Sequence, residues 1–208
     1  MKLLILGATG GTGMEMVRQA VDLEHEVTVF VRSPERLRGL ENRLRIETGD
    51  LLNSRDLARV THGQNAVLSA FGPRVPVARS DQHLLRDFAN ALTTAMKLTS
   101  VRRVLVESAA FLFKNAIIPP AYVVGKLFFP AIVRDQADME RIISDSGLDW
   151  TFIRPPRLTD GERTANFRIR VGHLPPFGFS ISRADVADCF LRLLPDEKSV
   201  KKIVGVSK

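Results

Sequence analysis

Three glycines spaced three residues apart, Gly7, Gly10 and Gly13, most constrain how this chain can fold. They follow an apolar run over residues 3–6 and precede a segment, 14–21, whose apolar residues recur at helical spacing. The pattern predicts a buried strand, a tight loop and a helix packed on a sheet. Free amides and the positive dipole end at such a helix start favour phosphate groups. We expect the loop to bind a dinucleotide diphosphate, unless it is only a glycine-rich turn, through Gly7, Thr9, Gly10, Gly11, Thr12 and Gly13.

The second predicted strand, residues 26–31, ends in basic rather than acidic residues. NAD-selective sites commonly place a carboxylate about 20 residues past the loop, where it binds the ribose hydroxyls. Here Arg32 stands at that distance, and Arg36 would lie one helical turn further on. Two guanidinium groups can bind a ribose 2′-phosphate, while the Ser33 hydroxyl donates to it and caps the next helix. This arrangement favours NADP(H) over NAD(H), unless both arginines are ordinary surface charges.

Further candidate residues follow the later strands, at the edge where their carboxyl ends meet. Ligands of open α/β sheets bind at this edge, near the point where the strand order reverses. Asp50 could accept from the adenine amino group, or could only stabilise its turn. Ser108 is expected beside the nicotinamide, where its hydroxyl binds a substrate carbonyl or the cofactor carboxamide, or only caps a turn. The remaining candidates are Leu51, Ala70, Phe71, Gly72, Arg74, Ala109 and Pro155.

Alternating strand and helix patterns predict an α/β fold, a doubly wound and mostly parallel sheet with helices on both faces. The expected Rossmann strand order is 3-2-1-4-5-6, with a seventh strand at 203–206 that would close the sheet, all within one NAD(P)-binding domain over residues 1–208. The six strands are expected at 3–6, 26–31, 44–48, 65–71, 103–107 and 150–153, with a short extra strand at 167–171 and loop from there to Phe179. Helices are expected at 55–60, capped by Ser54, at 81–97, capped by Ser80, at 131–146, and after the cap Ser182.

Composition limits the functional classes that suit this chain. Its 208 residues are 45% hydrophobic and 25% charged, enough for a substantial core. The net charge is +7, but the arginines are dispersed and form no aromatic-interleaved stripe, which disfavours nucleic acid and favours anionic small molecules. No apolar run reaches about 18 residues, so neither a membrane span nor a signal peptide is expected. With Cys189 as the single cysteine, we expect a cytoplasmic protein without a metal site. We expect the protein to be a monomer or a homodimer.

Together these residues resemble the atypical short-chain dehydrogenase/reductase superfamily, and within it the biliverdin-IXβ reductase and flavin reductase family. The likeness covers nearly the whole chain. The resemblance implies NADPH-dependent reduction of a flavin or another planar conjugated acceptor, such as a tetrapyrrole. It also implies that Arg32 and Arg36 lie near the 2′-phosphate and that Ser108 lies at the reaction centre. The most specific matching parts are 7–13, 27–32 with Arg36, 49–50, 72–74, 108–111, 146–148 and 181–182.

Two other functions stay open. Ser108, Tyr122 and Lys126 resemble the Ser and Tyr-x-x-x-Lys set of ordinary short-chain dehydrogenases. In that set the tyrosine is the general acid, the lysine lowers its pKa and the serine orients a carbonyl. The three would then be the catalytic residues of an NADPH-dependent carbonyl reductase or epimerase, although Pro130 cuts the helix that must carry two of them. The chain could instead be a non-catalytic NADP-sensing regulator.

The segment 112–130 interrupts the regular pattern of strands and helices. It is apolar, is punctuated by prolines and follows the strand that ends at the predicted ligand edge. Such a segment could cover the substrate, contact another subunit or pack against the sheet.

Overall fold

The structure, a computed structural model, describes residues 1–37, 39–40, 42–73, 83–113 and 130–208. Within these residues an eight-stranded sheet has the order β3-β2-β1-β4-β5-β6-β10-β8. All neighbouring strands are parallel except β8, which pairs with β10 in antiparallel fashion. The strands are β1 (Lys2–Leu6), β2 (Glu26–Val31), β3 (Arg45–Thr48), β4 (Ala66–Ser69), β5 (Arg103–Glu107), β6 (Asp149–Arg154), β8 (Arg168–Val171) and β10 (Lys202–Ser207). The predicted order 3-2-1-4-5-6 is confirmed, and β10 is the predicted seventh strand. It does not close the sheet as predicted, because β8 pairs with its outer side and forms that edge.

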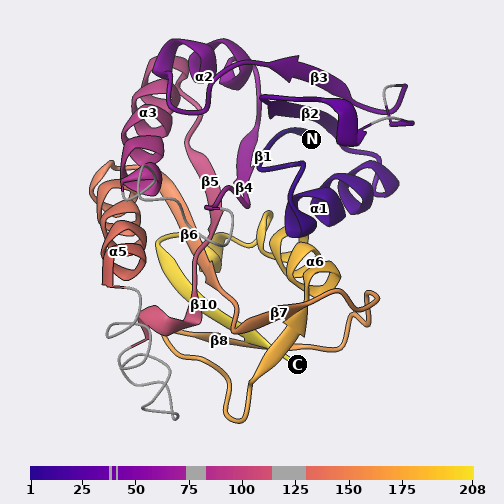
Figure 1. Ribbon diagram of the computed structural model, residues 1–208, viewed down its shortest axis with the longest axis vertical. Helices are drawn as coiled ribbons and strands as arrows, with labels where there is room; N and C mark the ends of the chain where they lie inside the picture. The colour runs from indigo at the N-terminus through magenta and orange to yellow at the C-terminus, as the bar shows by residue number, and fades with distance from the viewer. Residues whose placement is uncertain (38, 41, 74–82, 114–129) are drawn as a thin grey trace.

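Helices cover both faces of this sheet, as predicted (Figure 1). One face carries α1 (Gly11–Asp22) and α6 (Arg183–Leu193), and the other carries α2 (Ser54–Thr61), α3 (Leu84–Thr99) and α5 (Pro130–Asp145). Along β1, Leu3 and Ile5 pack toward the first pair of helices, while Leu4 and Leu6 pack toward the other three. Because both faces of β1 are buried, its sequence is a continuous apolar run rather than an alternating one.

Two helix starts differ from the prediction. Asn53, not Ser54, caps α2, because its side-chain oxygen accepts from the amides of Arg55 and Asp56 at 2.9 and 3.3 Å. The start of α3 has no side-chain cap of its own. Instead the carboxylate of Asp135, on α5, accepts from the amides of Leu85 and Arg86, each at 2.9 Å. The predicted cap Ser80 lies outside the described residues.

A second sheet has two strands that were not predicted, one on each side of the predicted loop that ends at Phe179. β7 (Arg157–Thr159) and β9 (Ser180–Ser182) pair in parallel and lead the chain into α6. Ser182 caps α6 as predicted, since its hydroxyl accepts from the amide of Asp185 at 3.0 Å. Each strand has three residues, too few for an alternating pattern to show in the sequence.

Three short 3₁₀ helices complete the regular structure of the described residues: η1 (Glu35–Leu37), η3 (Ala110–Leu112) and η4 (Glu197–Ser199). Within those residues, none of the helices combines the length and the apolar character that a bilayer crossing requires.

Candidate functional site

The glycine loop joins β1 to α1 at the carboxyl end of the sheet. Gly7 has φ +78°, a conformation that L side chains rarely adopt, and a Cβ there would lie 2.6 Å from the carbonyl carbon of Ala70. A Cβ on Gly13 would lie 2.1 Å from the carbonyl oxygen of Gly7, so only glycine lets the helix start so close to the strand end. This backbone geometry agrees with the predicted tight loop and with the predicted packing of the helix on the sheet.

The start of α1 is open to an anion. Its N-cap, Gly10, offers no side-chain hydrogen bond, and no acidic side chain stands in the first turn. Gly10 and Gly11 are exposed. Free amides and the positive dipole end thus face solvent at this point, a geometry that suits phosphate oxygens.

Basic residues at the end of β2 lie beside the loop. The guanidinium of Arg36 donates to the carbonyl oxygen of Thr9 at 3.1 Å, so one predicted phosphate ligand already touches the loop. Arg32 and Ser33 are exposed one turn earlier. The Ser33 hydroxyl does not cap η1, since no hydrogen bond joins it to a described residue. The short 3₁₀ turn is instead closed by the Leu37 amide, which donates to the Pro34 carbonyl at 2.8 Å.

Asp50 follows β3 and performs the structural role left open by the sequence. One carboxylate oxygen of Asp50 accepts from the amide of Leu52 at 2.9 Å, which stabilises the turn. The side chain stays exposed, so it remains available to a ligand, while Leu51 is buried.

The end of β4 lies directly against the glycine loop. The amide of Ala70 donates to the carbonyl of Leu6 at 3.0 Å, and Phe71 packs on Phe88 with ring centroids 4.8 Å apart. Among the described residues, no atom comes within 4 Å of a Cβ built on Gly72, so that glycine is not required for a close approach to any of them. Arg74 lies outside the described residues.

Two residues near the loop were not singled out from the sequence. Arg183, the first residue of α6, lies over the loop, since a Cβ on Gly11 would meet its Cδ at 2.4 Å. Its guanidinium forms an ion pair with exposed Asp160. Glu107, the last residue of β5, accepts from the Thr12 hydroxyl at 3.4 Å. Burial raises the pKa of Glu107 to about 7, although the Thr12 hydrogen bond and the charge of Arg183 oppose that rise.

Ser108, directly after β5, forms a buried polar cluster with Glu140 and Arg154. Glu140 comes from α5 and Arg154 ends β6, and their bidentate ion pair joins Arg154 Nε to Glu140 Oε1 at 2.9 Å and Arg154 Nη2 to Oε2 at 2.5 Å. Both side chains are only 9% exposed. The Ser108 hydroxyl, also buried, donates to the same Oε1 at 2.5 Å. The Arg154 guanidinium lies 4.7 Å from the ring centre of Phe113.

Of the remaining residues predicted near the nicotinamide, the structure describes Ala109 and Pro155. Ala109 is half-buried and Pro155 is buried, and the carbonyl of Pro155 accepts from the amide of Ala110 at 3.0 Å, which ties the ends of β5 and β6 together. Tyr122 and Lys126, together with most of the segment 112–130, lie outside the described residues. Glu140 was missed because only the fold brings it to Ser108, although a charged residue beside apolar Met139 on the buried face of α5 is a detectable signal.

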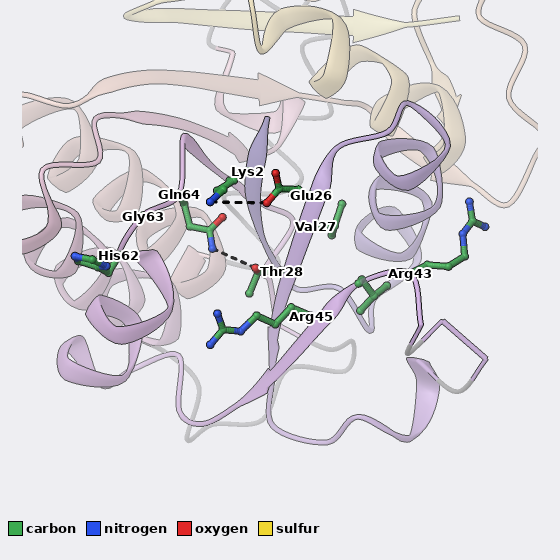
Figure 2. A pocket seen from close by; sticks show the side chains of 10 residues that line it. Lys2, Glu26, Val27, Thr28, Arg43, Arg45, His62, Gly63 and Gln64 are labelled. Atoms are coloured by element: carbon green, nitrogen blue, oxygen red, sulfur yellow. Dashed lines mark hydrogen bonds and ion pairs between the residues drawn. The ribbon is translucent and has the colours of Figure 1, made fainter.

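The opposite edge of the sheet has a polar hollow of about 360 Å³, shown in Figure 2. It lies at the amino ends of β1, β2 and β3, and there Lys2 and Glu26 approach to 3.9 Å. Open α/β sheets bind nucleotides at the carboxyl ends instead. The hollow is lined by Lys2, Glu26, Val27, Thr28, Arg43, Leu44, Arg45, His62, Gly63 and Gln64. Among the described residues, no group of three or more His, Cys, Asp and Glu side chains is placed to hold a metal ion.

Comparison with known proteins agrees with the geometry of the loop. Residues 7–197 match a family described as NAD(P)H-binding. YwnB, an uncharacterized protein of Bacillus subtilis, is 27% identical over 177 residues, 81% of this chain and 78% of YwnB. A Rossmann-fold NAD(P)-binding family protein from Shigella flexneri is 26% identical, with a TM-score of 0.74 and coverage of 100% and 93% of the two chains. ChuY, an anaerobillin reductase from Escherichia coli O157:H7, shares the fold at 18% identity, with a TM-score of 0.80 and coverage of 100% and 97%. The chain thus belongs to the NAD(P)H-binding family and has its Rossmann fold.

Proposed function

We propose that this protein is an NADPH-dependent reductase that transfers hydride to a flavin or another planar conjugated acceptor. The observation that carries the cofactor choice is the contact between the Arg36 guanidinium and the carbonyl of Thr9. It places a cation beside the glycine loop, in the segment after β2 whose first residue, Arg32, stands where NAD-selective sites commonly have a carboxylate. Arg32 and Ser33 extend the same exposed surface.

The residues at the loop fit a dinucleotide. Backbone atoms lie too close to Gly7 and Gly13 to leave room for a side chain at either position. The amides that start α1 are open to phosphate. We assign the diphosphate to the loop, and Arg183 to the same group, because the side chain of Arg183 packs on Gly11. Cofactor phosphate would then compete with the exposed Asp160 carboxylate for this guanidinium.

The nicotinamide end is assigned to the edge formed by Ser108, Ala109 and Pro155. NADPH, when bound, supplies the hydride, and a solvent proton completes the reduction of an oxidised flavin. The chain therefore has to bind both rings, orient them face to face and exclude competing reactions. A reductase in this fold is supported by ChuY, which is a reductase by name.

A carbonyl reductase or epimerase is the weaker candidate because of one hydrogen bond. In that chemistry a serine hydroxyl donates to the substrate carbonyl. The Ser108 hydroxyl already donates to the buried Glu140 carboxylate. A non-catalytic NADP sensor would need the same loop, so only turnover separates it from a reductase.

The test is NADPH oxidation by the purified protein, with FMN, riboflavin and biliverdin offered separately and NADH run in parallel. We expect saturable turnover that prefers NADPH over NADH. Cofactor binding measured by calorimetry without turnover of any of these acceptors would contradict the reductase and favour the sensor.

A further inference from the structure

Glu107 lies next to the start of the helix that follows the glycine loop. It is the last residue of β5, and its side chain is on the face of the sheet that α1 and α6 cover side by side (Figure 1). One carboxylate oxygen of Glu107 lies 3.4 Å from the hydroxyl oxygen of Thr12, in the first turn of α1. The same turn carries the free amides that suit a diphosphate. A carboxyl group and the proposed diphosphate therefore share one helix start.

Among the described residues, the cation that acts on the Glu107 carboxyl group is Arg183, the first residue of α6. Arg183 also packs on Gly11 of the loop and pairs with exposed Asp160. Charged groups on the surrounding elements have partners of their own: Glu15 with Arg18 on α1, Asp185 of α6 with the Thr164 hydroxyl, and Arg154 of β6 with Glu140 of α5 on the opposite face of the sheet. Glu107 and the diphosphate assigned to the loop therefore depend on the same guanidinium group.

The surroundings of Glu107 already favour its neutral form. Burial raises its pKa to about 7, while the Thr12 hydroxyl and the charge of Arg183 act to lower it. A bound diphosphate would bring negative charge to the helix start and would neutralise Arg183. Both changes disfavour the ionised carboxyl group, so its pKa rises further when the cofactor binds. Because the side chain is only partly buried, it can take a proton from solvent.

We propose that binding of NADP(H) at the glycine loop is coupled to the uptake of a proton by Glu107. The proton comes from solvent and converts the carboxylate to a neutral acid, which no longer repels the diphosphate. The acid can donate to the Thr12 hydroxyl oxygen, so their contact is kept with its polarity reversed. The inference rests on the proposed function only in placing the diphosphate at the loop. Glu107 is on this view a positioning residue, which acts on the cofactor through Thr12 and Arg183 and makes cofactor affinity fall as the pH rises.

Calorimetry on the unaltered protein tests the coupling directly. NADP⁺ is titrated into the protein at pH 8 in HEPES and in Tris, two buffers whose heats of ionisation differ. The difference between the two binding enthalpies, divided by the difference between the heats of ionisation, gives the number of protons taken up. At pH 8 the 2′-phosphate of the cofactor, with a pKa of about 6, is already ionised and takes up none. We expect uptake of about half a proton per bound NADP⁺.

Two glutamate variants separate Glu107 from other groups that titrate. Glu107→Gln keeps the shape of the side chain and cannot ionise, so it should take up no proton at pH 8. Relative to this variant, the natural protein should lose NADP⁺ affinity about 5- to 20-fold between pH 6.5 and pH 8.5. Glu197→Gln is the matched control, because it removes an exposed carboxylate of η4 next to the start of β10, at the opposite edge of the sheet. It should behave like the natural protein.

The outcomes separate this inference from the proposed function. Equal binding enthalpies in the two buffers overturn the coupling, even if flavins are reduced. Uptake that persists in Glu107→Gln also overturns it, because another group then takes the proton. The same holds if Glu107→Gln changes the affinity equally at both pH values, which is the mark of a purely structural role. If the protein reduces no acceptor but takes up a proton that Glu107→Gln does not, the reductase is wrong and the coupling stands.

Discussion

At the scale of single residues, the proposed preference for NADPH depends on the arginines after β2. We predict that Arg32→Ala combined with Arg36→Ala weakens NADPH binding far more than NADH binding. Each hydrogen bond to a charged group contributes about 1.5–3 kcal/mol, and only NADPH has the 2′-phosphate. Calorimetric dissociation constants for both cofactors check this, with Arg141→Ala as a control, since Arg141 pairs only with Asp138 on the surface of α5. An equal loss for the two cofactors would refute the assignment.

The raised pKa of Glu107 predicts that the stability of the fold depends on pH. Its pKa is raised from 4.5 to about 7 in the native protein, mainly by burial, so the native state keeps a proton that the unfolded state has lost. Stability should therefore fall as the pH rises from about 4.5 to about 7 and then level off. At about 1.4 kcal/mol per pKa unit, the loss is at most about 3.5 kcal/mol.

Urea unfolding at pH 5 and pH 8 tests this with Glu107→Gln, which keeps the shape and cannot ionise. The variant should gain stability relative to the natural protein at pH 8 and much less at pH 5. An identical difference between the two proteins at both pH values would mean that Glu107 does not titrate in this window.

At the scale of elements, α5 supplies the cap that α3 lacks. We predict that Asp135→Ala lowers the free energy of unfolding by about 1–2 kcal/mol, because the amides of Leu85 and Arg86 lose their acceptor. Asp138→Ala, one turn further along α5, is the control, since its carboxylate pairs only with Arg141. Urea unfolding measures both. Asp135 bonds to the start of α3 and makes no hydrogen bond to a described residue of the glycine loop, so we expect NADPH binding not to change. A change in binding without a change in stability would contradict the capping role.

The same elements show which features a sequence can predict. The strands β2 and β5 were predicted to the residue, because buried parallel strands are continuous apolar runs bounded by polar residues. The glycine loop was predictable because its residues are contiguous. By contrast, the cap from Asp135 and the cluster of Ser108, Glu140 and Arg154 join separate elements, so local patterns do not predict which of these side chains meet.

At the scale of the whole molecule, the strand order was predictable because consecutive parallel strands are joined by right-handed crossovers. That order also places the glycine loop, the Arg36 contact and the Ser108 cluster at one edge of the sheet. The polar hollow of Figure 2 lies at the other edge. The antiparallel pairing of β8 was not predicted, since four exposed residues give no sign of which strand they will join.

The pairing of β10 has a consequence for the order in which the nascent chain folds. β10 bonds to β6 on one side and to β8 on the other, although β8 is synthesised first. Until the ribosome has made residues 202–207, at about 5–20 residues per second, β8 has no strand to join and β6 keeps a bare edge. Such an edge invites pairing with other chains. The time needed to translate the residues from β6 to β10 therefore sets how long the unpaired edge of β6 can pair with other chains and aggregate.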